Sequence, residues 1–223
     1  MAVSKEELAR MMDSTNVKAT ATESEIEKLC KDAVEYGFGC VCVNLVYVKL
    51  AARLLKGSRV KVCSTIGFPF GVTLSEIKAL EAVKAVESGA EELDMVISLS
   101  ALKSGDYEAV RRDVAAVVDV KRLSKEIVVK VIIETACLRN EEKVIACRLV
   151  KEAGADFVKT STGFFGKGAS VEDVRLMRET VGSDFGVKAA GGIRTYADTV
   201  AMIEAGANRI GTSAAIAIIE GAR

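Results

Sequence analysis

The chain has 223 residues, half of them hydrophobic, which suits a single domain with a sizeable core. Its 31 basic and 31 acidic residues cancel, so no net field attracts nucleic acid or an anionic membrane. The sequence contains no histidine, which excludes Ser-His-Asp and Cys-His catalysis and H-E-x-x-H metal sites. An enzyme built from this chain must use lysine, carboxylate, hydroxyl, thiol or backbone groups.

The N-terminal segment MAVSKEELAR is charged and lacks the apolar core of a secretory signal. No stretch approaches the roughly 18 apolar residues of a membrane span. We therefore expect a cytoplasmic protein. The cysteines never form C-x-x-C and mostly lie in apolar runs, so we expect buried reduced thiols rather than disulfides or zinc ligands: Cys30, Cys40, Cys42, Cys63, Cys137 and Cys147.

Helical and strand-like patterns alternate along the chain. The first helical segment opens with Thr22 and Glu25, which form a capping box, and the segment at 73–89 repeats the pair with Thr73 and Glu76. Further helices are predicted at 107–118 and from Ser170, a predicted N-cap. Apolar runs between the helices predict buried strands at 40–44, 59–67, 91–98, 127–135, 156–162, 185–192 and 208–213.

Strands that alternate with helices predict a parallel sheet covered by helices. We expect a (β/α)8 TIM barrel that forms one domain over residues 1–223, with its remaining strand near 10–15. The alternative is an open doubly wound sheet, but no G-x-G-x-x-G follows a first strand to support a dinucleotide site.

Lysines stand inside four of the predicted strands: Lys61, Lys130, Lys159 and Lys188, the last three spaced 29 residues apart. Barrel strands have no solvent face, so such lysines are buried or lie at a mouth of the barrel. Together with Asp94 and Glu134 they predict a polar cluster in an apolar setting. One interpretation is a structural ion-pair network, because buried charges must be paired.

The other interpretation is catalytic. Burial and a neighbouring cation both disfavour a charged lysine, and a neutral lysine adds to carbonyls to form a Schiff base. Lys159 and Lys188, on adjacent predicted strands, form the natural pair, with Asp94 as their carboxylate partner. We expect Glu134, Lys61 and Lys130 to give structural support.

Glycine turns follow two consecutive strands, in AGGIRT (190–195) and IGTSAA (210–215). Backbone N–H groups at such turns, beside a helix N-terminus, can hold a phosphate, and barrels commonly do so after strands 7 and 8. With Arg194 adjacent, these turns predict a phosphate site.

The motifs VKVIIET, FVKTSTG, VKAAGGIR and RIGTS, in this order, closely resemble those of deoxyribose-phosphate aldolases. The likeness covers nearly the whole chain, including DSTNVKATAT, STIGFPFG and EELDMV. It implies a (β/α)8 barrel that acts in deoxyribonucleotide catabolism. Such enzymes cleave 2-deoxy-D-ribose 5-phosphate reversibly to acetaldehyde and glyceraldehyde 3-phosphate, without a metal or organic cofactor. It also implies a homodimer or homotetramer.

The resemblance assigns site residues position by position. It makes Lys159 the Schiff-base former and Lys188 and Asp94 its partners in proton transfer. It places the phosphate on Gly163, Gly191, Gly192, Arg194, Gly211 and Ser213. It adds four further substrate-binding positions: Asp13, Thr15, Cys42 and Thr162.

Several positions depart from the family's usual pattern. Asp13 is followed by Ser14 rather than histidine, and Ala214 replaces a serine of the last phosphate loop. The GFFGKG segment places Phe165 and Lys167 in the loop that follows the Schiff-base lysine in the sequence. These changes leave the lysine chemistry intact and bear on phosphate affinity and acceptor range. Two alternatives stay open: a Schiff-base aldolase for another sugar phosphate, and a sugar-phosphate-binding barrel without turnover.

Overall fold

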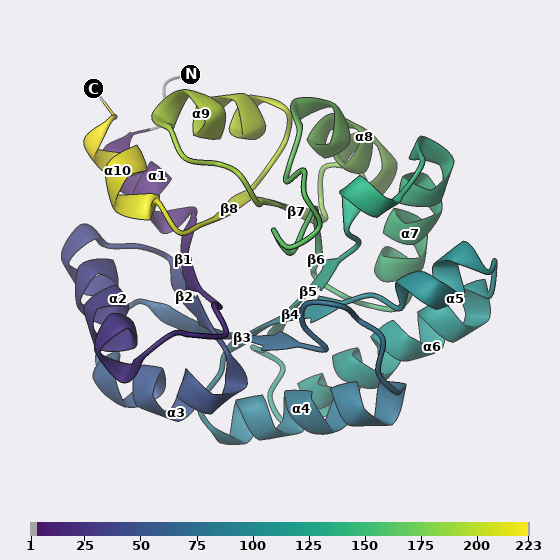
Figure 1. Cartoon of the computed structure of the whole chain (residues 1–223), viewed down its shortest axis with the longest axis horizontal. Helices are drawn as coiled ribbons and strands as arrows, with labels where there is room; N and C mark the ends of the chain where they lie inside the picture. The colour runs from purple at the N-terminus through teal and green to yellow at the C-terminus, as the bar shows by residue number, and fades with distance from the viewer. Residues whose placement is uncertain (1–3, 223) are drawn as a thin grey trace.

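The computed structural model describes residues 4–222, so residues 1–3 and 223 of the predicted domain lie outside the described residues. Eight parallel strands follow one another around a closed barrel, and β8 pairs with β1 (Figure 1). The (β/α)8 prediction is confirmed and the open doubly wound alternative is wrong. The strands are β1 (Met12–Asn16), β2 (Cys40–Val43), β3 (Lys61–Ile66), β4 (Glu92–Val96), β5 (Val128–Ile132), β6 (Phe157–Lys159), β7 (Gly186–Ala190) and β8 (Arg209–Thr212).

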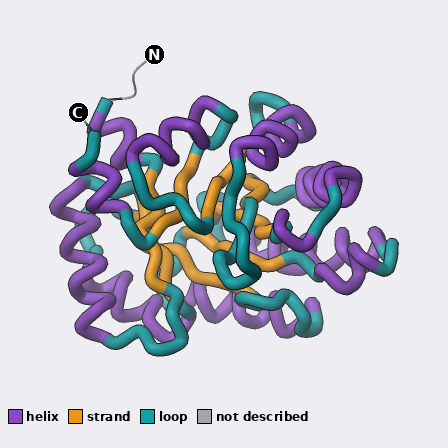
Figure 2. Tube along the Cα trace, turned by 45° about the horizontal axis from the view of Figure 1, so that its top comes forward, coloured by secondary structure: helices purple, strands orange, loops and turns teal. Residues whose placement is uncertain are grey.

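Helices form a ring outside the strands, as Figure 2 shows. The first and last helices meet in this ring, where α1 contacts α10 (Figure 1). The helices are α1 (Lys5–Arg10), α2 (Glu23–Tyr36), α3 (Leu45–Leu54), α4 (Ser75–Glu87), α5 (Leu99–Lys103), α6 (Tyr107–Val118), α7 (Asn140–Glu152), α8 (Val171–Val181), α9 (Tyr196–Glu204) and α10 (Ala215–Glu220), with short 3-10 turns η1 (Asp119–Arg122) and η2 (Thr135–Cys137). In the described part of the chain, none of the helices has the length and apolar character needed to span a bilayer.

The hydrophobic core lies between the strands and the helix ring. Strand residues that alternate toward the helices join it, as Leu93 and Met95 of β4 do. Their neighbours Glu92 and Asp94 therefore point into the barrel, where both are buried. Because every strand alternates in this way, the side chains that face the barrel interior are separate from the hydrophobic core.

Local caps set most of the predicted helix starts. Thr22 accepts a hydrogen bond from the backbone of Glu25 in a complete capping box, and Ser170 caps α8, so both predictions are confirmed. The predicted box of Thr73 and Glu76 is wrong, because α4 begins at Ser75. The hydroxyl of Ser75 donates to Asp113 of α6 at 2.9 Å, which ties the start of α4 to α6.

Candidate active site

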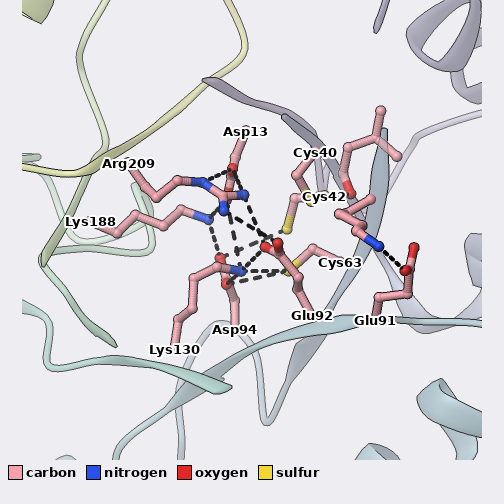
Figure 3. A network of polar contacts seen from close by, with 12 residues as sticks. Asp13, Cys40, Cys42, Cys63, Glu91, Glu92, Asp94, Lys130, Lys188 and Arg209 are labelled. Carbon is pink, nitrogen blue, oxygen red and sulfur yellow. Dashed lines mark hydrogen bonds and ion pairs between the residues drawn. The ribbon is translucent and has the colours of Figure 1, made fainter. Parts of the chain in front are cut away.

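An ion-pair network fills the interior of the barrel (Figure 3). Lys130 Nζ lies 2.9 Å from Asp94 Oδ1 and 2.7 Å from Glu92 Oε2. Arg209 donates through Nε to Asp13 Oδ1 at 2.9 Å and through Nη2 to Glu92 Oε2 at 3.0 Å. Each buried carboxylate of the network is thereby paired with a cation, which buried charges require.

Lys159 and Lys188 share one carboxylate oxygen at the top of this network. They face each other in the register of β6 and β7. Each Nζ lies 2.7 Å from Asp94 Oδ2, and Lys188 also pairs with Asp13. Lys130 lies deeper, because its register partner on β6 is Phe157, two residues before Lys159. The predicted pairing of Lys159 and Lys188 around Asp94 is therefore present in the geometry.

Neighbouring charges shift the pKa values of Lys188 and Asp94 in opposite directions. Burial lowers the pKa of Lys188, but the carboxylates of Asp13 and Asp94 outweigh burial and hold that pKa well above its ordinary value. Burial alone would raise the pKa of Asp94, whereas Lys130, Lys159 and Lys188 hold it well below the ordinary range. Lys188 is fully buried, while Lys159 reaches a cavity.

The cavity has a volume of about 440 Å³ and opens at the carboxyl ends of the strands. Lys159 lies on its wall. Nine of the predicted substrate-binding residues line it: Thr15, Cys42, Thr162, Gly163, Gly191, Gly192, Arg194, Gly211 and Ser213. Asp13, predicted to line the same pocket, lies instead fully buried in the ion-pair network. Asp94 and Lys188 likewise belong to the network and do not line the cavity.

Two glycine loops pack backbone against backbone at the rim of the cavity. A Cβ on Gly168 would lie 2.0 Å from Gly191 O, so only glycine fits there. Ala169 N donates to Gly191 O at 3.0 Å, which ties the loop after β6 to the loop after β7. Gly191 and Gly192 both have positive φ, at 89° and 78°, a conformation that glycine adopts readily. This rim offers backbone N–H groups to an anion.

Lys61 does not belong to the cluster, so that part of the prediction is wrong. It is the first residue of β3, its side chain is 51% exposed, and it pairs with Glu91 outside the barrel. A lysine at the start of a strand reaches solvent because the loop before it is exposed. Glu134 is buried, but it also stands apart from the ion-pair network and accepts hydrogen bonds from Thr162.

Sequence reasoning missed Glu92 and Arg209. Arg209 holds Asp13 and Glu92 together across the barrel. Side chains two residues apart on a strand point to the same face. Glu92 stands two residues before Asp94 and Arg209 two before Gly211, so this rule would have placed both charged residues inside the barrel.

Thiols complete the barrel wall, where Cys40, Cys42 and Cys63 are buried and free. Cys63 Sγ donates to Asp94 Oδ1 at 3.3 Å. Two groups, Cys42 with Cys63 and Asp94, and Asp13 with Cys40 and Glu92, have metal-like spacing. Their carboxylates are already neutralised by lysine and arginine, so a metal ion would have to displace an ammonium or guanidinium group.

The arrangement defines a class of protein. A lysine on the cavity wall, a carboxylate shared with a second lysine, and a glycine-rich anion rim suit an enzyme that forms a Schiff base with a phosphorylated carbonyl compound. The family described as DeoC/LacD family aldolase matches residues 5–220. The chain belongs to this family.

Individual relatives agree with this assignment. A deoxyribose-phosphate aldolase of Thermococcus gammatolerans is 60% identical over 219 residues, covering 97% of each chain. One of Thermoanaerobacter sp. (strain X514) is 59% identical over 213 residues, covering 96% of each. The solved structure of deoxyribose phosphate aldolase from Aeropyrum pernix, described as a unique tetrameric structure, is 39% identical with a TM-score of 0.90. That alignment covers 97% of this chain and 91% of the other.

Proposed function

We propose that the protein cleaves 2-deoxy-D-ribose 5-phosphate reversibly to acetaldehyde and D-glyceraldehyde 3-phosphate through a Schiff base on Lys159. One observation carries the proposal: of the three lysines on Asp94, Lys159 is the one that lines the cavity. The names of relatives near 60% identity support the same substrate.

The first step is addition of Lys159 Nζ to the C1 aldehyde of the open-chain sugar. Loss of water leaves an iminium, which withdraws electrons from the C2–C3 bond. Asp94 Oδ2 contacts Lys159 and Lys188 equally, at 2.7 Å, so one oxygen connects the two nitrogens for proton transfer. The ammonium of Lys188 can supply a proton to this relay.

The second step breaks the C2–C3 bond. Its electron pair forms an enamine on Lys159 as the C3 hydroxyl loses its proton, through a water, to the carboxylate of Asp94 in the relay with Lys188. Glyceraldehyde 3-phosphate leaves, and the enamine takes a proton at C2. Addition of water to the resulting iminium releases acetaldehyde and restores Lys159. This series of reaction steps balances in atoms and charge without a metal or organic cofactor.

The phosphate is expected at the glycine rim. Gly163, Gly191, Gly192, Gly211 and Ser213 line this part of the cavity, and Arg194 adds a positive charge beside it. Loops of this kind bind phosphate through backbone N–H groups. Binding of the phosphate would place C1 of the sugar toward Lys159, which lines the same cavity.

The direct test is an assay of acetaldehyde release from 2-deoxyribose 5-phosphate in EDTA. We expect turnover with the phosphorylated sugar and much weaker turnover with 2-deoxyribose. Tight binding of the sugar phosphate without cleavage would favour the alternative of a binding protein. Preference for a longer sugar phosphate would favour the other alternative, an aldolase of the same chemistry.

We propose a cytoplasmic homo-oligomer, a dimer or tetramer, that binds a small sugar phosphate and neither nucleic acid nor membrane. The tetrameric description of the Aeropyrum pernix relative supports assembly. Exposed apolar side chains on α4 and the loop before it offer a surface for a second copy: Phe70, Val72, Leu74, Ile77 and Leu80. Sedimentation of the wild type against Ile77→Asp tests this proposal.

A further inference from the structure

Glu134 stands at the end of β5 in an unusual backbone conformation. Its φ of 54° is the one positive value among the non-glycine residues that the structure describes. Ile133 N donates to Lys159 O at 3.0 Å. Thr135 N donates to Thr160 O at 2.9 Å, so this chain segment advances two residues where β6 advances one. Glu134 is therefore an extra residue in the ladder, and such bulges redirect a side chain.

The redirected side chain reaches the loop after β6. Glu134 Oε2 accepts from Thr162 N at 2.9 Å and from Thr162 Oγ1 at 2.5 Å. Thr162 Oγ1 also accepts from Phe164 N at 3.1 Å. A hydroxyl has one hydrogen and two lone pairs. The hydrogen and one lone pair of Thr162 are thus committed, and one lone pair remains for a ligand in the cavity that Thr162 lines.

We propose that Glu134 is a positioning residue that fixes the Thr162 hydroxyl as a hydrogen-bond acceptor and so selects a hydroxyl group at that point of the substrate. A sugar hydroxyl can donate to the remaining lone pair. A carbonyl, ether or phosphate oxygen would oppose it with a second acceptor, so that neither oxygen receives a hydrogen bond from the other. This proposal rests on the proposed function and concerns the substrate specificity of the same site.

The burial of Glu134 supports a functional role. The side chain is fully buried, and its Oε1 has no hydrogen-bond partner within residues 4–222. Thr135 Oγ1 and Ser161 Oγ, at the same ends of β5 and β6, are also buried without a partner there. Unpaired buried polar atoms and a left-handed non-glycine backbone both reduce stability. A turn that served the fold alone would favour glycine at this position.

The test compares two assays in Glu134→Ala and Glu134→Gln. Cleavage of 2-deoxyribose 5-phosphate needs the hydroxyl contact, whereas borohydride trapping of acetaldehyde on Lys159 does not, because acetaldehyde carries no hydroxyl. We expect Glu134→Ala to lower kcat/KM for cleavage on the order of tenfold to 100-fold while trapping stays within about twofold of the wild type. Glu134→Gln should restore most of kcat/KM, because an amide oxygen can accept both bonds from Thr162.

A double-mutant cycle identifies the partner. In a Thr162→Val background, which removes the hydroxyl, Glu134→Ala should change kcat/KM less than about twofold. If Glu134→Ala fails to fold, Glu134→Gly accepts the φ of 54° and gives the same comparison. Equal losses in cleavage and trapping, or a full loss in the Thr162→Val background, would overturn the proposal. A wild type that neither cleaves the sugar nor traps acetaldehyde would instead refute the proposed function.

Discussion

The interior of the barrel and the rim of its cavity differ in charge, in exposure and in the groups from which they are built. The interior is sealed and charged, with Asp94 in contact with the side-chain nitrogens of three lysines. The rim is open and built largely from backbone, with glycines such as Gly191 at positive φ. The two regions lie on the same strands, one along the strands and the other just past their ends.

The difference separates chemistry from recognition. Fixed charges act strongly in a medium of low dielectric, but each must be paired there, which makes the interior rigid. Backbone N–H groups carry no net charge and tolerate an open, hydrated setting. Lys159 lies at the boundary, since its Nζ contacts Asp94 while its side chain lines the cavity. Substitutions on either side of this boundary should therefore have different effects.

The largest effect is expected at the boundary itself. Lys159→Ala removes the nucleophile and should lower kcat at least about 10⁴-fold. The fold should survive, because Asp94 keeps Lys130 and Lys188 as partners. The measurement is acetaldehyde release under saturating sugar phosphate, with thermal unfolding as the control. Activity within tenfold of the wild type would place the chemistry on another residue.

Inside the barrel, the principal loss should be in stability. Lys130→Met leaves Glu92 and Asp94 each without one cation, and breaking such a buried pair should lower the free energy of unfolding by about 3–5 kcal/mol. Urea unfolding measures the change. Lys61→Met is the matched control, because its exposed pair with Glu91 should contribute less than about 1 kcal/mol. Similar losses in both variants would contradict the distinction between them.

Acid should destabilise the protein through the buried carboxylates Asp13 and Asp94. Burial raises the pKa values of Asp13 and Asp94, but neighbouring cations hold both below the ordinary 3.8. The stability they contribute is complete above that value and is lost as pH falls through the lower folded-state values. Unfolding measured from pH 7 to pH 2 should show a loss on the order of 2 kcal/mol per carboxylate. Asp13→Asn should make this acid slope shallower, and an unchanged slope would count against the account.

Alkali should act through the lysines. Asp13 and Asp94 raise the pKa of Lys188 above the ordinary 10.5 despite burial, so its contribution holds below pH 10.5 and fades as pH rises through the higher folded-state value. The same unfolding series, extended upward, should therefore stay level until pH exceeds about 10.

At the rim, the loss should be in binding alone. Gly168→Ala would force a methyl group against Gly191 O and displace the loop, so we expect KM for the sugar phosphate to rise about tenfold. Acetaldehyde trapping on Lys159 should be unaffected. Gly166→Ala, in the same loop, tests backbone strain alone, because its φ is 81° and a Cβ there meets nothing within 4 Å. A larger change in trapping than in KM would show that rim and interior are not separate.

The sequence predicted the barrel and the Lys159–Lys188 pair because alternating patterns and equal spacing reflect local geometry. Lys130 has the same 29-residue spacing yet lies deeper, because spacing along the chain also counts loop residues. The extra residue at Glu134 shows how a bulge shifts such a count. Thr73 failed as a cap because α4 begins two residues later, at Ser75, and Leu74 holds the N-cap position. Asp13 was assigned to the pocket by resemblance, which carries no information on depth.

The central claim is that Lys159, and not Lys188, forms the Schiff base. Borohydride reduction in the presence of acetaldehyde and EDTA, followed by peptide mass mapping, tests it most directly. We predict one reduced adduct, on the peptide that contains Lys159, present in Lys188→Met and lost in Lys159→Ala. An adduct on Lys188, or none on a folded protein that cleaves the sugar phosphate, would contradict the account.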